Sequence, residues 1–204
     1  MGTCLMAKLK NIYLVILAVI HPLLIRIARW FTRATYRKKF KLIRKITLII
    51  PIEFNHDTQL ENFSKGNATS FNYFSNKITD SNFLNVTHRL YPGKRYVVRL
   101  FVCMTEISSE DCLAFLRDRD DLLVGAQGLT LFFQLAKDII PLNTWIISFD
   151  RRKGLYLWQQ SEKRQGVYLV PAIVRLEDGT FEYTLPHFEG RWNIGDCFVS
   201  FHMV

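Results

Sequence analysis

The sequence predicts an α+β fold, in which an N-terminal apolar and basic helix precedes a domain with a mainly antiparallel sheet and two helices packed on one face. Residues 1–50 carry eleven Lys and Arg residues and no acidic residue. After residue 90, a strand-like run and two helix-like segments come before four or five strand-like runs at short intervals. The 204 residues are enough for one ordinary domain and an appendage.

The composition is that of a packed globular chain, with 49% hydrophobic and 22% charged residues. These values exclude collagen-like, wholly disordered and disulfide-scaffold proteins. Only one segment approaches the length of a bilayer span, which excludes a polytopic membrane protein. The four cysteines are scattered without a CxxC pair, so we expect free thiols in a reducing compartment, no structural zinc, no other metal and no cofactor.

The segment Asn11–Ile25 contains fifteen residues and no charge. A helix of this length spans about 22 Å, which is shorter than a hydrocarbon core of about 30 Å. Snorkelling of Lys10 and Arg26 would help it to span, whereas His21 and Pro22 weaken a spanning helix. The segment therefore predicts either a short transmembrane helix or a helix lying in the membrane plane.

A basic helical face is predicted directly after this segment. Six cations follow at intervals of 3, 4, 4, 4 and 3 residues, a spacing that places them on one side of a helix. Trp30 lies at the edge of that side, where an aromatic ring suits the headgroup level. We predict contact with anionic lipid through Arg26, Arg29, Trp30, Arg33, Arg37, Lys41 and Arg44.

The excess of Lys and Arg on the C-terminal side of the apolar segment predicts that residues 51–204 are cytoplasmic. Three alternatives remain for the N-terminal segment. It has partial features of a secretory signal or an organelle presequence, and a short apolar run is also compatible with a buried core helix, which would make the whole chain cytoplasmic and soluble. Translation starting at Met6 would remove the first five residues.

Three regions are predicted from these shifts in composition: residues 1–45 form the membrane-associating helix, 46–90 an edge strand and a connector, and 91–204 the globular domain. Pro51 confines the β-prone run Ile46–Phe54 to an edge strand or a strand end. Residues 55–86 contain seven Asn residues. They form either a disordered linker or a region that docks on the domain through Phe63, Phe71, Phe74 and Phe83.

In the domain, Tyr96–Cys103 has the pattern of a buried strand. Ser108 is a good N-cap for a helix that ends near Arg117, and a second helix is expected over Leu129–Ile139. Strands are then predicted over Thr144–Phe149, Leu155–Gln159, Val167–Leu176 and Cys197–Met203, with a hairpin turn at Asp178 and Gly179.

Few residues suggest chemistry. The sequence Gly125-Ala-Gln-Gly128 precedes a predicted helix, so Gly125, Gln127 and Gly128 are a weak candidate for an anion-binding loop. A tight turn with close helix packing is the alternative interpretation of this segment. Asp118, Asp120 and Asp121 form either a hard-cation site or, more plainly, a solvated loop.

Cys112 near a helix N-terminus, paired with His187 or His202, is a conceivable catalytic dyad that no sequence proximity supports. Hydrolase, metalloprotease and nucleotide-binding signatures are absent from the sequence. Catalytic residues therefore stay unassigned.

We predict a membrane-tethered interaction or accessory domain that faces the cytoplasm. A small hydrolase-like enzyme with its site near Gly125–Gly128 is the first alternative, and nucleic-acid contact by the basic arm is the second. Residues 51–204 carry sixteen basic and eighteen acidic residues, so the folded domain is not expected to bind nucleic acid. The expected partners are anionic lipid and a protein whose identity the sequence does not give.

Overall fold

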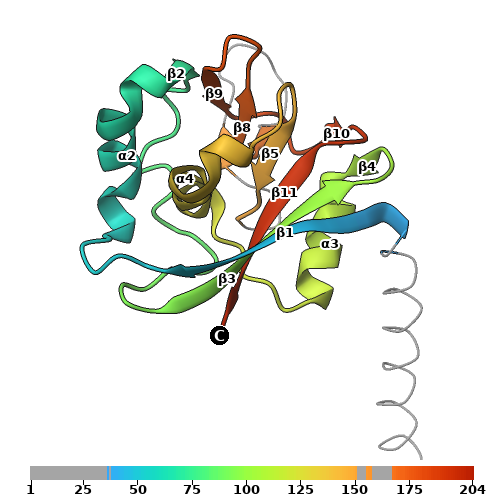
Figure 1. Cartoon of the computed structure of the whole chain (residues 1–204), viewed down its shortest axis with the longest axis horizontal. Helices are drawn as coiled ribbons and strands as arrows, with labels where there is room; N and C mark the ends of the chain where they lie inside the picture. Colours follow the sequence, from blue (N-terminus) through green and yellow to red (C-terminus); the bar gives the residue numbers. More distant parts are fainter. Residues whose placement is uncertain (1–35, 37, 151–154, 158–166) are drawn as a thin grey trace, which may run out of the picture. The chain divides into compact units, whose positions relative to one another are not determined.

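The structure is a computed structural model that describes residues 36, 38–150, 155–157 and 167–204 (Figure 1). Contacts along the chain delimit a compact unit, Lys39–Val204. Its start differs from the predicted boundaries at residues 45 and 90, because residues 46–90 are folded into the same unit. The predicted apolar helix Asn11–Ile25 lies outside the described residues.

A seven-stranded sheet organises this unit, in the order β1-β3-β11-β5-β8-β9-β2. Four of its six strand pairs are antiparallel, and the β11–β5 and β2–β9 pairs are parallel. The predicted α+β class with a mainly antiparallel sheet is therefore confirmed. The strands are β1 Phe40–Ile49, β2 Phe71–Phe74, β3 Arg95–Cys103, β5 Trp145–Ser148, β8 Ala172–Arg175, β9 Phe181–Thr184 and β11 Cys197–Met203.

Two small ladders accompany the sheet. Strand β4 (Ile107–Ser108) pairs with β10 (Arg191–Trp192), and β6 (Leu155–Leu157) pairs with β7 (Val167–Leu169). The helices of the described residues are α2 Gln59–Asn67, α3 Ser109–Asp118 and α4 Gly125–Ala136, with short 3₁₀ segments η1 His56–Thr58, η2 Ala68–Ser70 and η3 Lys137–Ile139.

The predicted placement of the two domain helices on one sheet face is wrong. Val98 and Leu100 of β3 belong to the same buried cluster as Phe132 of α4. Phe101, the residue between Leu100 and Val102, instead contacts Phe115 of α3 with 5.0 Å between the ring centroids. Because successive side chains of a strand point to opposite faces, α3 and α4 cover opposite faces of the sheet. Strand β3 is consequently buried on both sides, and its residues from Tyr96 to Cys103 are apolar except for Arg99.

An aromatic cluster fixes α3 to its face of the sheet. Phe115 lies 4.5 Å from Phe40 of β1 and 5.9 Å from Phe198 of β11, measured between ring centroids. Rings at these separations pack favourably beyond the area they bury. Ser108 caps the helix as predicted, since its hydroxyl accepts a hydrogen bond from the Asp111 amide.

The Asn-rich region 55–86 docks on the domain, which resolves the two alternatives in favour of packing. Its helix α2 buries Leu60 and Phe63, and Phe63 contacts Phe133 of α4 edge-on at 5.6 Å. The Asp80 carboxylate accepts hydrogen bonds from the amides of Leu60 and Glu61, so it caps the helix from a distant loop.

The remaining elements differ from prediction mainly at their ends. Strand β11 has the predicted bounds, and the predicted turn places Gly179 at φ 85°. The run Val167–Leu176 is split into β7 and β8 around Pro171, which cannot donate to a ladder. The second helix begins at Gly125 instead of Leu129, because the expected loop Gly125–Gly128 forms its first turn.

Candidate functional site

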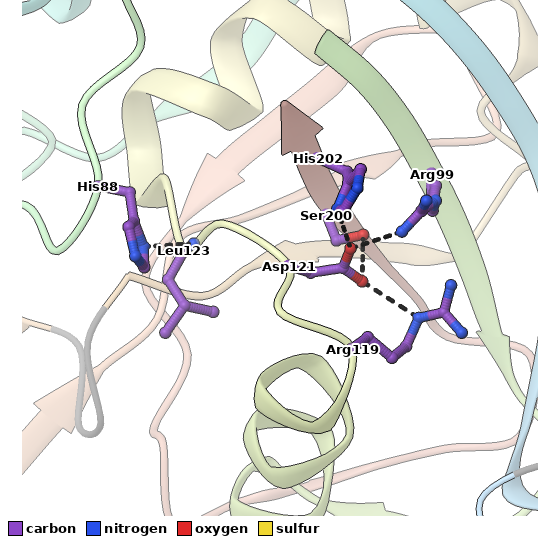
Figure 2. Close-up of polar contacts among 7 residues, drawn as sticks. All are labelled: His88, Arg99, Arg119, Asp121, Leu123, Ser200 and His202. Atoms are coloured by element: carbon purple, nitrogen blue, oxygen red, sulfur yellow. Dashed lines mark hydrogen bonds and ion pairs between the residues drawn. The ribbon is translucent and has the colours of Figure 1, made fainter. Parts of the chain in front are cut away.

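The most concentrated polar cluster of the described residues surrounds Asp121 (Figure 2). Its carboxylate side chain has no exposed surface. Arg99 Nη1 donates to Oδ1 at 2.6 Å, and Arg119 Nε donates to Oδ2 at 3.2 Å. The Ser200 hydroxyl donates to Oδ2 at 3.2 Å, and His202 Nδ1 lies 3.7 Å from Oδ1.

The end of α3 places Asp121 at the centre of this cluster. Asp120 adopts a left-handed backbone with φ 54°, which reverses the chain after the helix. The Asp121 amide then donates to the Leu116 carbonyl at 3.1 Å, closing the turn. Arg99 and Ser200 are direct cross-strand partners on β3 and β11, so both project toward the carboxylate from the same sheet face.

This geometry is that of a buried ion-pair network and lacks the order of a nucleophilic triad. In a triad the imidazole lies between the hydroxyl and the carboxylate, whereas the Ser200 hydroxyl contacts Asp121 directly. The separation of 3.7 Å between His202 Nδ1 and Asp121 is also too long for a hydrogen bond. The cluster therefore joins α3 to the sheet and presents no activated nucleophile.

His88 makes the neighbouring contact in Figure 2. Its Nδ1 accepts a hydrogen bond from the Leu123 amide at 3.0 Å, and its own amide donates to the Leu123 carbonyl at 3.2 Å. An accepting Nδ1 requires the imidazole proton to be on Nε2 in the neutral ring. His88 thus fixes the loop before α4.

The structure does not support the predicted anion loop at Gly125, Gln127 and Gly128, because the three residues are buried and the amides of both glycines already have carbonyl partners. The Gly125 amide donates to the Phe149 carbonyl, and the Gly128 amide donates to the Val124 carbonyl, each at 3.1 Å. Gln127 donates its side-chain amide to the Phe83 carbonyl. The alternative of a tight turn with close helix packing describes this segment better.

Asp150 occupies the position at the start of α4 that an anion would take. A Cβ on Gly125 would lie 2.9 Å from the Asp150 Cβ and 3.5 Å from its Oδ2, so the carboxyl group packs against the helix N-terminus. A carboxylate there is stabilised by the positive end of the helix dipole. This internal acid leaves no room for an external anion.

The other chemical candidates do not assemble either. Among the described residues, no group of three or more His, Cys, Asp or Glu side chains could hold a metal ion, and Asp121 is bound by arginines. Cys112 is buried, and desolvation raises the pKa of its thiol well above the usual value. A buried thiol of raised pKa is a poor nucleophile.

Only part of the predicted membrane-contact face can be located. Arg26, Arg29, Trp30, Arg33 and Arg37 lie outside the described residues. Lys41 and Arg44 lie on β1, so the predicted helix 1–45 does not extend through them. The β-branched, apolar run that includes these two cations pairs with β3, and this pairing overrides the helical spacing.

Strand β1 is itself a candidate interaction surface that the sequence did not single out. It is ten residues long and lies at one end of the sheet (Figure 1). Of its side chains, Leu42, Ile43 and Ile49 are exposed apolar groups, and Lys41, Arg44 and Lys45 are exposed cations. In the sequence, the mixed apolar and basic run 40–49 indicates such a strand, but its cations also fit a helical spacing.

Comparisons with known protein families, curated proteins and solved structures found no match to this chain. Within the residues that the structure describes, no helix is long and apolar enough to cross a membrane.

Proposed function

We propose that this protein is a membrane-tethered interaction domain whose N-terminal segment contacts anionic lipid and whose compact unit, Lys39–Val204, binds a protein partner on the cytoplasmic side. The supporting observation is the separation of charge. All eleven cations of residues 1–50 come before the first acidic residue, Glu53, whereas residues 51–204 are slightly acidic.

Anionic lipid is the ligand that best fits the first part of this segment. Clustered Lys and Arg beside an apolar run gain about 1 kcal/mol each near an anionic membrane surface. In this proposal, Arg26, Arg29, Arg33 and Arg37 contact headgroups, and Trp30 lies at the interface. Lys41 and Arg44 are left out of the lipid contact because they belong to the folded unit.

An enzymatic alternative has less support from the geometry. The loop on which it rested, Gly125–Gly128, is buried, and the carboxylate of Asp121 is held by two arginines. A hydrolytic site needs a nucleophile beside a base, and neither Ser200 nor Cys112 has that arrangement.

Vesicle co-sedimentation tests the tether. The full chain is mixed with vesicles of phosphatidylserine and phosphatidylcholine, and the triple variant Arg29→Glu, Arg33→Glu, Arg37→Glu is compared with it. Three reversed charges should reduce vesicle binding by at least about tenfold. The control, Lys77→Glu with Lys137→Glu, reverses two exposed cations of the folded unit and should bind as the unaltered chain does.

Binding to single-stranded RNA provides the contrasting measurement. If the triple variant loses RNA binding with a steep salt dependence while vesicle binding persists, the arm is a nucleic-acid contact and the tether is excluded. Extraction of cell membranes with high salt and then with alkaline carbonate separates a peripheral helix from an integral one. A chain found wholly in the soluble fraction would also contradict the proposal.

A further inference from the structure

Strand β1 has an outer edge with which none of the described strands pairs. Its inner edge is bonded to β3, and Ile50, just beyond the strand, donates its amide to the Lys94 carbonyl and accepts from the Gly93 amide. Backbone groups alternate in direction along a strand. The amides and carbonyls of Lys45, Thr47 and Ile49 therefore point away from β3.

The two edges of the sheet are unequal. Strand β2 at the opposite edge has four residues, a length that offers little template for another strand. Strand β1 has ten, with a bulge between Leu42 and Arg44. A bulge and lysines commonly protect an edge against unwanted pairing, but here they lie between Lys41 and Lys45. Pairing with β3 is regular from Arg44 to Ile49, which is a longer template than β2, and Ile46–Ile49 carries no charge.

Charge around this edge is positive. Lys41, Arg44 and Lys45 are exposed on β1 itself, and Lys45 lies directly opposite Arg99 of β3. Arg95, also exposed, lies opposite Ile49. Of the acidic residues described, Asp121 is the one bound to Arg99, and it is buried.

We propose that an acidic, extended segment of a protein partner adds to the outer edge of β1 as an eighth strand. Main-chain hydrogen bonds to Lys45, Thr47 and Ile49 would supply the pairing, and acidic side chains would lie opposite the exposed cations. The inference rests on the proposed function, of which β1 is the partner surface.

Lipid is a weaker fit to this edge than a peptide. Hydrocarbon offers no hydrogen-bond partner, so burying the outward amides in a membrane would leave them unsatisfied. A second copy of the chain would pair backbone with backbone, but it brings the same cations to the contact. An acidic strand satisfies both the backbone groups and the charge.

Hydrogen exchange read at single amides tests the proposal on the full chain. The probe is an alternating glutamate–valine peptide of about seven residues, the length of an ordinary strand. When the peptide is present at about ten times its Kd, the amides of Lys45, Thr47 and Ile49 should exchange about tenfold more slowly. Those of Ile46 and Leu48, which already bond to β3, should change little. An alternating lysine–valine peptide should have no effect.

The variant Thr47→Pro separates strand addition from simple charge attraction. It keeps every cation and removes one outward N–H, and proline is tolerated where that group faces solvent. Peptide affinity should fall by about tenfold or more. Because this variant could unfold, the triple variant Lys41→Glu, Arg44→Glu, Lys45→Glu provides a second measure, with Lys77→Glu, Lys137→Glu as its control. Thermal melting confirms that each variant is folded.

Other outcomes would overturn the proposal. These are protection outside β1, equal binding of both peptides, and unchanged affinity in folded Thr47→Pro. Protection of the same amides by anionic vesicles alone would assign the edge to lipid. Concentration-dependent protection with dimer formation in the absence of peptide would assign it to a second copy. In the Arg29→Glu, Arg33→Glu, Arg37→Glu variant, vesicle binding should fall, whereas the acidic peptide should still slow exchange of the outward β1 amides. A failed tether and a failed strand addition therefore give different results.

Discussion

Arg99 Nη1 and Asp121 Oδ1 lie 2.6 Å apart, and this contact joins the centre of β3 to the loop that follows α3. Asp121 is fully covered, whereas 17% of the Arg99 side chain and 34% of the Arg119 side chain are exposed. The single carboxylate therefore lies between two guanidinium groups and offsets the repulsion between them at the end of the helix. It acts as a structural link between α3 and the sheet.

Replacing this carboxylate should destabilise the fold. Asp121→Asn keeps the shape but leaves two cations without their counter-charge, so we expect a loss of about 2 to 3 kcal/mol in the free energy of unfolding. The partial exposure of both arginines keeps the loss below that of a fully buried pair. Urea titration measures it.

The matched control is Glu106→Gln, which removes an exposed ion pair with Arg191. Exposed pairs contribute less than about 1 kcal/mol, so this variant should unfold almost as the unaltered chain does. Equal midpoints for the two variants would mean that the Asp121 network adds nothing to stability.

Two helical glycines should respond in opposite ways to alanine. In α4, a Cβ on Gly128 would lie 2.0 Å from the Val124 Cγ2 and 3.2 Å from a ring carbon of Phe201. In α2, a Cβ on Gly66 would meet nothing within 4 Å. Gly128→Ala should therefore cost about 1 to 3 kcal/mol through overpacking. Gly66→Ala should stabilise by up to about 1 kcal/mol through helix propensity. Thermal unfolding of both variants checks the signs, and a stabilising Gly128→Ala would contradict the close packing of α4.

Elements with a strong local pattern could be predicted from the sequence. Strand β3, the Ser108 cap and the Asp178–Gly179 turn depend on residues adjacent in the chain. Helix α2 was missed because its cap, Asp80, comes from a loop twenty residues away. The bounds of β1 were missed because Lys41 and Arg44 also fit a helical period. Only the pairing with β3 decides between a helix and a strand.

The Asp121 cluster was beyond prediction for the same reason. Its members come from β3, the end of α3 and β11, which only the strand order brings together. One signal was available in the sequence. Arg99 interrupts the apolar run Tyr96–Cys103, and a charge inside a buried strand needs a partner. The partner's identity could not be read from the chain.

The buried thiols should resist alkylation in the folded state. Desolvation raises the pKa of Cys197 to about 12, and it also raises that of Cys112. At about pH 8 the thiolate fraction of both is therefore very small. In the Cys4→Ser variant, iodoacetamide should label the native protein slowly and label Cys103, Cys112 and Cys197 fully in guanidinium chloride. Rapid labelling of Cys112 in the native protein, measured by mass spectrometry, would show that this thiol is reactive.

His56 should make the stability of the fold depend on pH. It is buried against Phe54, neither ring nitrogen has a hydrogen-bond partner among the described residues, and burial lowers its pKa, with Arg89 contributing. Asp57 and Asp80 act in the opposite direction but do not outweigh burial.

The direction of this pH dependence follows from the number of protons that the folded and unfolded states bind. In the unfolded chain His56 titrates near its ordinary pKa of about 6.5, so below that pH the unfolded state binds a proton that the folded state resists. The contribution of neutral His56 to stability is complete above about 6.5 and is lost as pH falls through its lower folded pKa. Asp196, whose pKa is raised by burial, works in the opposite direction at lower pH. A variant comparison is therefore needed to isolate His56.

His56→Phe removes the titrating group and keeps an aromatic ring beside Phe54. Between about pH 7.5 and pH 5.5, the unaltered chain should lose more stability than this variant, as measured by the shift in urea midpoint. The protection factors of amides in α2, which begins just after His56, compare the measured exchange rate with the intrinsic rate at each pH. They should fall over the same interval only in the unaltered chain. Parallel pH profiles for the two proteins would show that His56 is protonated equally in the folded and unfolded states.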